Sequence, residues 1–289
     1  MQPGCKLQKM SIFVNMETQR KAVLVTGGSS GIGAATVRLL SETGFKVYAA
    51  SRSGKAPEGS QDDSGIVPVV MDVNDADAID AAVRRILDEC GNLYAVVCNA
   101  GNGIAGPIEE TSIEEVQAQF STTFFGVVKT VQSCLPVFRH QGEGRVVTVS
   151  SVAAVAPLPY QGFYSSAKAA ILQMTKALSI ETKDFGVQAC CIMPGDVRTG
   201  FTKARKVAVK ALDKDSPYYE GTLRGVAAME KDENDGMEPE VIGRAIVRQL
   251  RKKKMKPEVT PTALYGLLVW AIRRFPQSLV LYVLKKMYS

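Results

Sequence analysis

The chain has 289 residues, of which 46% are hydrophobic and 22% charged, an ordinary composition for a soluble globular protein. Its one histidine, His140, leaves almost nothing for a histidine triad or a multi-histidine metal site, so no metal is expected. Its six cysteines lack metal-ligand spacing and predict buried free thiols in a reducing compartment, the cytoplasm. The net charge is +6, and the positive charge is concentrated in residues 244–289, which contain eleven lysines and arginines and one acidic residue. That segment therefore carries +10, and the rest of the chain carries −4. This distribution argues against a nucleic-acid groove along the fold.

Runs rich in valine, isoleucine and alanine alternate along the chain with segments of helical periodicity. Such continuous apolar runs are typical of strands buried on both faces of a parallel sheet. The predicted strands are residues 22–26, 47–51, 66–71, 94–98, 145–150 and 187–193. The predicted helices are residues 31–42, 76–90, 113–138, 163–184 and 239–253. This alternation predicts an α/β fold with a doubly wound parallel sheet, helices on both of its faces, and ligands at the carboxyl ends of the strands.

A glycine-rich turn, Thr26-Gly-Gly-Ser-Ser-Gly-Ile-Gly33, directly follows the first strand and opens the first helix. The glycines let the chain turn tightly and let backbone N–H groups approach a pyrophosphate at the positive end of the helix. In this context the turn predicts a dinucleotide site. The residues expected to contact the cofactor are Gly27, Ser29, Ser30, Gly31, Ile32 and Gly33.

The end of the second predicted strand distinguishes the two nicotinamide dinucleotides. An acid there accepts hydrogen bonds from a free ribose, whereas an arginine accommodates the 2′-phosphate. This chain has Ser51-Arg52-Ser53 and no acid before Glu58. The pattern favours NADP(H), and the alternative is a solvated arginine on a loop.

Two further turns fit a cofactor cleft. Asp72 follows the third strand, where its carboxylate would accept from an adenine amine or, equally, cap the helix that begins near Asp75. The small polar turn Asn99-Ala100-Gly101 follows the fourth strand and is expected to lie against the cofactor.

Tyr164 and Lys168 are four residues apart, and Ser151 lies thirteen residues before the tyrosine. Spacing of four on a helix puts both side chains on one face, where an ammonium would lower the pKa of the phenol. A tyrosine tuned in this way exchanges a proton with a substrate oxygen near neutral pH. Taken alone, the pair is more often an exposed lysine beside a packed tyrosine.

Together these motifs, with Pro194-Gly195-x-Val197-x-Thr199, resemble the short-chain dehydrogenases/reductases in order and spacing. The resemblance implies a single-domain Rossmann fold with a seven-stranded parallel sheet, and a homodimer or homotetramer. It implies that Tyr164 is the general acid or base, that Lys168 binds the nicotinamide ribose and that Ser151 holds the substrate oxygen. It adds to the cofactor-binding residues Val73, Pro194, Gly195, Val197 and Thr199, along with Tyr164 and Lys168.

One position departs from the family pattern. Many relatives place an asparagine in the long helix, three residues before a glycine, where it helps to relay protons through water. Here Thr123 occupies that place before Gly126. We expect activity to survive with Thr123 in a modified relay, the alternative being a protein that binds the dinucleotide without turnover, as a sensor or regulator.

The chain is divided into an N-terminal extension (1–19), a catalytic domain (20–260) and a basic amphipathic extension (261–289). The N-terminal stretch lacks the apolar run of a signal peptide, which argues against export. Residues 198–238 are polar and poorly periodic, and are predicted to form a substrate lid or a disordered loop. The tail is expected either to lie in a membrane interface as a peripheral contact or to pack on the domain or an oligomer partner. It resembles extensions of relatives that act on steroids, retinoids and keto-lipids, which favours a hydrophobic ketone or secondary alcohol as substrate, with NADP(H) or alternatively NAD(H) as cofactor.

Overall fold

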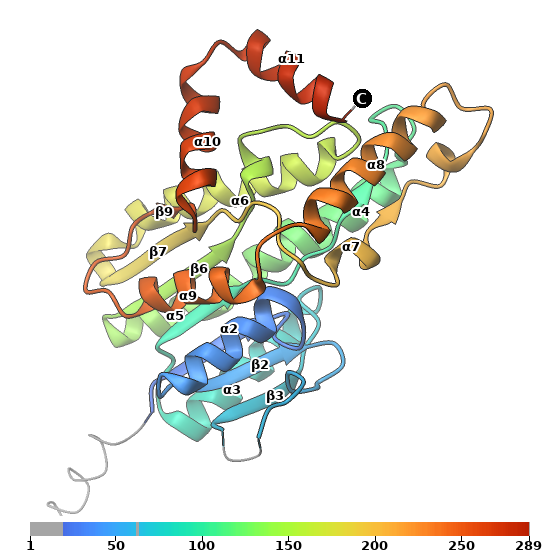
Figure 1. The fold of residues 1–289 in the computed structure, drawn as a ribbon. Coiled ribbons are helices and arrows are strands. Elements are labelled where there is room, and N and C mark those ends of the chain that lie inside the picture. The colour runs from blue at the N-terminus through green and yellow to red at the C-terminus, as the bar shows by residue number, and fades with distance from the viewer. Residues whose placement is uncertain (1–19, 62–63, 289) are drawn as a thin grey trace, which may run out of the picture.

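The computed structural model describes residues 20–61 and 64–288 (Figure 1). The predicted N-terminal extension, with Cys5, lies outside the described residues. The five cysteines within them are free and buried, as the sequence predicts.

Seven parallel strands form the main sheet, in the order β3-β2-β1-β4-β6-β7-β9. The strands are β1 Ala22–Thr26, β2 Lys46–Ser51, β3 Ile66–Val70, β4 Ala95–Cys98, β6 Gly144–Val149, β7 Val187–Ile192 and β9 Glu258–Val259. The six strands predicted individually are present, each with ends within one residue of the prediction. The chain leaves β1 toward β2 and β3 and then returns to β4 on the other side, so the strand order reverses between β1 and β4. Such a switch point is where doubly wound sheets bind ligands.

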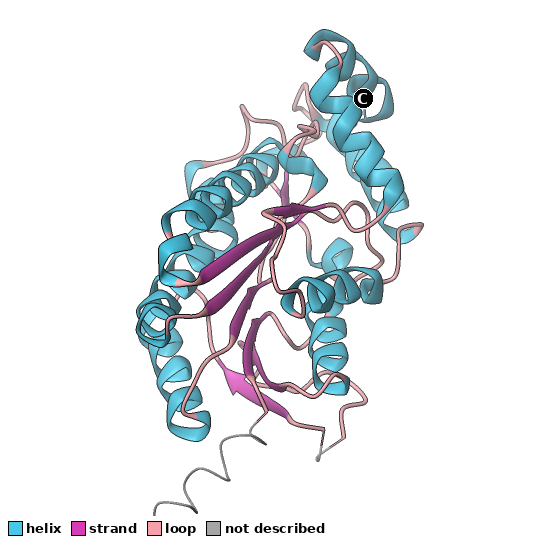
Figure 2. Ribbon diagram, turned by 90° about the vertical axis from the view of Figure 1, so that its left-hand side faces the viewer, coloured by secondary structure: helices cyan, strands magenta, loops and turns pink. Residues whose placement is uncertain are grey.

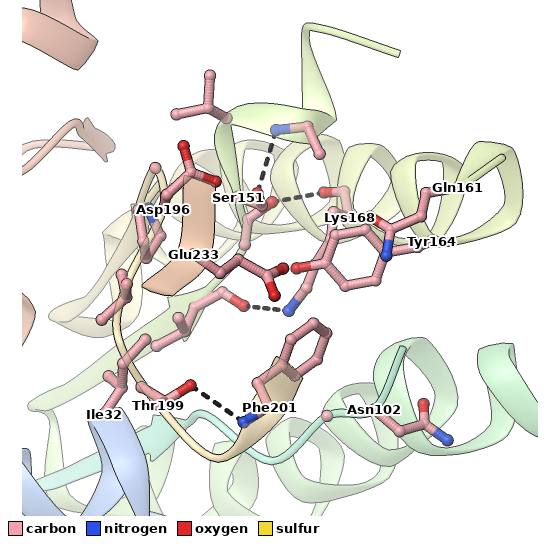
Figure 3. A pocket seen from close by; sticks show the side chains of 18 of the residues that line it. Ile32, Asn102, Ser151, Gln161, Tyr164, Lys168, Asp196, Thr199, Phe201 and Glu233 are labelled. Carbon is pink, nitrogen blue, oxygen red and sulfur yellow. Dashed lines mark hydrogen bonds between the residues drawn. The ribbon is translucent and has the colours of Figure 1, made fainter. Parts of the chain in front are cut away.

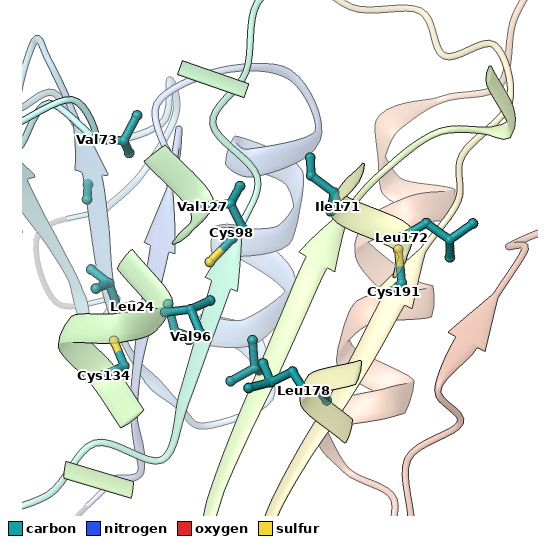
Figure 4. Packing of buried hydrophobic residues seen from close by; sticks show 14 of the residues in the cluster. Leu24, Val73, Val96, Cys98, Val127, Cys134, Ile171, Leu172, Leu178 and Cys191 are labelled. Carbon is teal, nitrogen blue, oxygen red and sulfur yellow. The ribbon is translucent and has the colours of Figure 1, made fainter. Parts of the chain in front are cut away.

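Helices cover both faces of this sheet (Figure 2). They are α2 Gly31–Glu42, α3 Ala76–Cys90, α4 Ile113–Phe120, α5 Gly126–Gln141, α6 Gly162–Glu181, α7 Phe201–Ala204, α8 Tyr219–Asn234, α9 Pro239–Leu250, α10 Ala263–Arg274 and α11 Gln277–Tyr288. A hydrophobic core lies on each face of the sheet, and successive residues of β1 point alternately into one core and the other, because side chains alternate along a strand. Val23 and Val25 pack with α2 and α9, whereas Leu24 lies in the core formed with α3, α5 and α6 (Figure 4). The predicted Rossmann architecture is confirmed.

The helix predicted for residues 113–138 is interrupted. A π-helical segment, Ser121–Phe125, separates α4 from α5, and the Gly126 N–H bonds the carbonyl of Ser121. Isolated π turns inside helices occur frequently at functional sites. The segment contains Thr123, whose hydroxyl is tied to Gln119 and Asn102.

Residues 198–238 are ordered, so the alternative of a disordered loop is wrong. They contain α7, α8 and the short strand β8 Lys206–Val207, which pairs with β5 Ile104–Ala105 in a second sheet. Helix α8 approaches the Tyr160 ring so closely that a Cβ on Gly225 would lie 2.6 Å from it. Because Gly225 has no side chain, α8 packs closely against Tyr160 although the helix has no continuous apolar stripe. The polar sequence of residues 198–238 does not reveal this contact.

The tail folds back on the domain as α10 and α11. The Tyr265 ring of α10 packs so closely on Gly195 that a Cβ there would lie 2.0 Å from the ring. In α11, Tyr288 Oη donates to Asp232 at 3.1 Å. The inner faces of both helices therefore pack on their own chain. Among the described helices, none combines the length and the apolar character needed to cross a bilayer.

Candidate active site

A cavity of about 980 Å³ follows the carboxyl edge of the sheet and continues under α10 and α11. All predicted site residues line it except Gly33 and Thr123. The predicted residues that line it are Gly27, Ser29, Ser30, Gly31, Ile32, Ser51, Arg52, Ser53, Asp72, Val73, Asn99, Ala100, Gly101, Ser151, Tyr164, Lys168, Pro194, Gly195, Val197 and Thr199. Loops that lie far apart in the sequence thus meet in one hollow.

The glycine-rich turn forms a cradle for an anion at one end of this cavity. Gly27 has a φ of +66°, and a Cβ on Gly33 would lie 2.0 Å from the Gly27 carbonyl oxygen. Gly33 is thus the residue that lets α2 begin against the turn. Ser30 makes no side-chain cap on α2, which leaves the N–H groups of the first helical turn available to a ligand. These features fit a dinucleotide pyrophosphate.

Thr26 fixes the neighbouring turn, a role that the sequence analysis did not assign to it. Its Oγ1 accepts from the N–H groups of Asn99 and Ala100, both at 3.0 Å. In return, Asn99 Nδ2 donates to the carbonyls of Thr26 at 3.1 Å and Gly27 at 3.3 Å. The only sequence feature that could have indicated this role is the position of the threonine directly before the first glycine of the turn.

The residues at the ends of β2 and β3 occupy the adenosine side of the predicted site. Arg52 is exposed, and the buried Ser51 lies with its hydroxyl 3.2 Å from that of Ser53. Asp75 caps α3 by accepting from two N–H groups, whereas Asp72 accepts from the Asn74 N–H at 2.9 Å. The helix-cap alternative for Asp72 is therefore wrong, and its carboxylate lines the cavity.

Ser151, Tyr164 and Lys168 converge beyond the end of β6 (Figure 3). The Ser151 hydroxyl accepts from the Ala153 N–H at 3.1 Å, and Lys168 Nζ donates to the carbonyl of Val149 at 2.9 Å. Lys168 Nζ lies 5.6 Å from the centroid of the Tyr164 ring. The neighbouring Ser150 donates its hydroxyl to the Lys168 carbonyl at 2.7 Å, which favours Ser151 as the serine that serves the substrate.

Burial dominates the electrostatics of this trio. It raises the pKa of Tyr164 to about 12, with a hydrogen bond to Ser151 acting in the opposite direction. It also lowers the pKa of Lys168 to about 8. Desolvation is thus the largest cause of both shifts, and the role of Lys168 in lowering the phenol's pKa stays a prediction.

Thr123 lies behind the cavity wall. It is fully buried; its hydroxyl accepts from Gln119 Nε2 at 2.8 Å and donates to Asn102 Oδ1 at 3.0 Å. A Cβ on Gly101 would lie 3.8 Å from Thr123 Oγ1 and 3.7 Å from Lys168 Nζ, so the two side chains approach the same short stretch of backbone. The role of Thr123 in a proton relay remains a prediction.

Several residues that line the cavity were not foreseen from the sequence. Polar ones are Asn74, Asn102, Gln161, Asp196, Lys206 and Glu233, and apolar ones from the tail are Leu268, Ala271, Ile272, Phe275, Leu279, Val280, Val283, Leu284 and Met287. The Phe201 ring lies 5.7 Å from the Tyr164 ring. The sequence offered no spacing that marks Glu233 and the tail residues, because they reach the cavity only through the docking of α8, α10 and α11.

Comparisons with known proteins agree with this geometry. The family model for short chain dehydrogenases matches residues 21–209. The 3-ketodihydrosphingosine reductase of Bacteroides thetaiotaomicron is 36% identical over 235 residues, which cover 81% of this chain and 85% of that protein. A short-chain dehydrogenase from Streptomyces avermitilis has a similar structure, with a TM-score of 0.77, 25% identity, and coverage of 87% of this chain and 91% of that one. A short-chain dehydrogenase/reductase from Burkholderia phymatum, solved with NAD, gives a TM-score of 0.74 at 20% identity over 88% of this chain and 93% of that one.

The buried lysine gives a prediction about stability. Without cofactor, Lys168→Met should raise the free energy of unfolding by on the order of 2 kcal/mol near neutral pH, after the lost hydrogen bond to Val149 is allowed for. The reason is that the folded-state pKa of about 8 lies below the ordinary value of 10.5, so folding is penalised below pH 8 and the penalty disappears as pH rises through 10.5. The difference between variant and wild type should therefore narrow over that window.

Urea denaturation at several pH values measures this difference. Lys183→Met, at an exposed position, is the matched control and should change stability by less than about 0.5 kcal/mol at every pH. A Lys168→Met protein that is less stable than wild type, or a difference independent of pH, would contradict the assignment.

Proposed function

The chain belongs to the short-chain dehydrogenases, a family of oxidoreductases that use nicotinamide dinucleotides, and on that premise we propose that it interconverts a hydrophobic ketone and a secondary alcohol with NADP(H). One observation carries the proposal. The Ser151–Tyr164–Lys168 trio shares a cavity with the glycine cradle of α2, so a dinucleotide bound in the cradle has room to reach the tyrosine.

The side chains would divide the reaction as follows. Held by the glycine turn, a nicotinamide dinucleotide would provide the hydride, or take it up, at the carbon that carries the oxygen. In the direction of reduction, Tyr164 Oη donates its proton to the carbonyl oxygen, while Ser151 holds that oxygen through its hydroxyl. Lys168, with its ammonium beside the ring, stabilises the phenolate that results until solvent returns the proton.

Removal of the phenol hydroxyl tests this mechanism. Tyr164→Phe should lower NADPH-dependent reduction of a lipophilic ketone by at least about 10²-fold, because it removes the hydroxyl proposed to protonate the carbonyl oxygen. The dissociation constant for NADPH, measured by fluorescence titration, should remain within a few-fold of wild type. Tyr160→Phe, which leaves the trio intact, is the matched control for loss of a tyrosine hydroxyl. Retained turnover in Tyr164→Phe would refute the assigned role.

Arg52 supports NADP(H) over NAD(H) as the cofactor. It lines the cavity at the end of β2, next to Ser51 and Ser53. Its guanidinium is exposed and so is accessible to a 2′-phosphate. Arg52→Ala should weaken NADPH binding about tenfold or more and leave NADH binding almost unchanged. Arg84→Ala, on the exposed side of α3, is the control. Calorimetric titration gives both affinities, and equal effects on the two cofactors would count against NADP(H).

A keto-lipid fits the substrate end better than a compact ketone. Apolar side chains of α10, of α11 and of the turn between them line the cavity, and five of them are also exposed at the surface: Leu268, Phe275, Leu279, Val283 and Met287. A long alkyl chain would bury its methylenes along this wall. The similarity to a 3-ketodihydrosphingosine reductase supports the same substrate class, a long-chain ketone with an adjacent amine. The proposed homodimer or homotetramer and the cytoplasmic location stay predictions.

We also propose that the outer face of α10 and α11 rests on a membrane. The face is defined by Leu264, Leu267, Trp270, Leu281 and Tyr282, which are exposed and lie outside the cavity lining. Exposed cations of the same helices, Arg274, Lys285 and Lys286, complement the charge of anionic lipids. Leu268, Leu279 and Val283 of the same helices are exposed and line the cavity, so a water-poor substrate would enter it from the bilayer.

Flotation with vesicles that contain anionic phospholipid tests this contact. Wild-type protein should float with the vesicles, and a variant with Leu264, Leu267 and Trp270 each replaced by serine should lose most of that binding because it loses the apolar side chains that enter the interface. A control variant replaces three exposed apolar residues elsewhere, Val70, Ile180 and Val209, by serine and should float like wild type. Wild-type protein that stays at the bottom of the gradient would refute the contact.

A further inference from the structure

Two polar side chains that the proposed reaction does not use lie beside Tyr164. Glu233 comes from α8, and its carboxylate and the Tyr164 hydroxyl point toward one another (Figure 3). Gln161 immediately precedes α6 and lines the same end of the cavity. It is 2% exposed, and its Nε2 has no hydrogen-bond partner among the described residues. A buried amide donor without a partner is costly, which suggests that a ligand satisfies it.

The fixed charges at this end leave one carboxylate uncompensated. Arg205, whose side chain is 1% exposed, forms an ion pair with Glu233, and Thr202 donates to the same carboxylate at 2.6 Å. Asp196 also lines the cavity, but its partner there is the neutral Tyr265 hydroxyl, at 2.7 Å. Two carboxylates therefore face one buried guanidinium. Burial raises the pKa of both Asp196 and Glu233, so each would gain from a cation brought close to it.

The position of Tyr164 determines which part of a substrate meets these groups. The reacting carbonyl oxygen must lie at the Tyr164 and Ser151 hydroxyls, so substituents on the adjacent carbons lie next to Glu233 and Gln161. The remainder of the molecule then extends toward the apolar side chains of α10 and α11. The lining thus combines polar side chains beside Tyr164 with apolar side chains from the tail (Figure 3).

Building on the proposed function, we propose that Glu233 and Gln161 bind the polar head of the substrate. Glu233 binds a protonated amine on the carbon next to the reacting carbonyl, and Gln161 Nε2 donates to a neighbouring hydroxyl oxygen. The substrate is then a long-chain α-amino ketone with a β-hydroxyl. Of the two lysines in this part of the lining, Lys206 is exposed to solvent and Lys168 donates to the Val149 carbonyl. Neither of them is paired with Glu233.

Paired substrates measure this recognition directly. We compare kcat/KM for NADPH-dependent reduction of the long-chain amino ketone and of the same ketone without the amine, at a pH below the amine's pKa. Wild-type protein should prefer the amino ketone by about tenfold or more, the effect of one charge-assisted hydrogen bond. Glu233→Gln should abolish this preference while it retains turnover of the ketone without the amine, and Glu233→Asp should restore part of the preference.

Two further variants separate recognition from folding. Glu238→Gln is the matched control, because Glu238 is exposed and also pairs with an arginine, Arg198. It should leave the preference unchanged. Gln161→Leu should lower kcat/KM severalfold for the substrate with the β-hydroxyl and have little effect on the analogue that lacks it. Since each result is a ratio between two substrates of one protein, a partly unfolded variant does not mimic it.

The outcome distinguishes this inference from the proposed function. Equal reduction of both ketones by wild type, or a preference that persists in Glu233→Gln, overturns the inference and leaves the reductase intact. If no ketone consumes NADPH, the proposed function fails, and calorimetry still tests recognition. In that case a long-chain amino alcohol should bind the NADP⁺-saturated protein about tenfold more tightly than the alcohol without the amine, and only while Glu233 is present. Equal affinities overturn the inference.

Discussion

Every part of the candidate site depends on one topological constraint, the parallel direction of all seven strands in the main sheet. Because the carboxyl ends of parallel strands lie along one edge, the loops after β1, β2, β3, β4, β6 and β7 deliver their side chains to the same hollow. The reversal of strand order beside β1 then opens a crevice there. Gly33 completes the arrangement, since α2 begins against the turn after β1 only where no Cβ intervenes.

Local patterns predicted the sheet and most of the cofactor side for a physical reason. Strands buried on both faces must be apolar throughout, and the turn at Gly27 and Gly33 must lack side chains, so both constraints appear directly in the residue types. The π-helical segment at Thr123 has no such sequence pattern, because the hydrogen bonds of the Thr123 hydroxyl are made with Asn102 and Gln119. The fold and the cofactor side could thus be predicted because each residue type there is determined by its own strand or turn.

The residues on the substrate side could not be predicted from the sequence, because their contacts join segments that lie far apart in the chain. Glu233 lies in a run of charged residues, and only the burial of Arg205 against it shows that it faces inward. Tyr265 reaches the loop after β7 because Gly195 leaves space for its ring. The two alternatives for the tail, packing and membrane contact, also prove compatible, since the inner faces of α10 and α11 pack on the domain and their outer faces stay apolar and exposed. Burial of Tyr164, the largest cause of the rise in its pKa, likewise depends on distant segments that the spacing to Lys168 does not reveal.

The central claim is that this cavity joins hydride transfer from a nicotinamide to proton transfer from Tyr164. Isotope tracing tests it most directly: NADPH deuterated on both faces of the nicotinamide C4 is incubated with the protein and a long-chain ketone, and the product is analysed by mass spectrometry. We predict an alcohol that carries one deuterium on the carbon that bore the carbonyl. Deuterium that stays in the cofactor while the ketone is consumed, or an alcohol without the label, would contradict it.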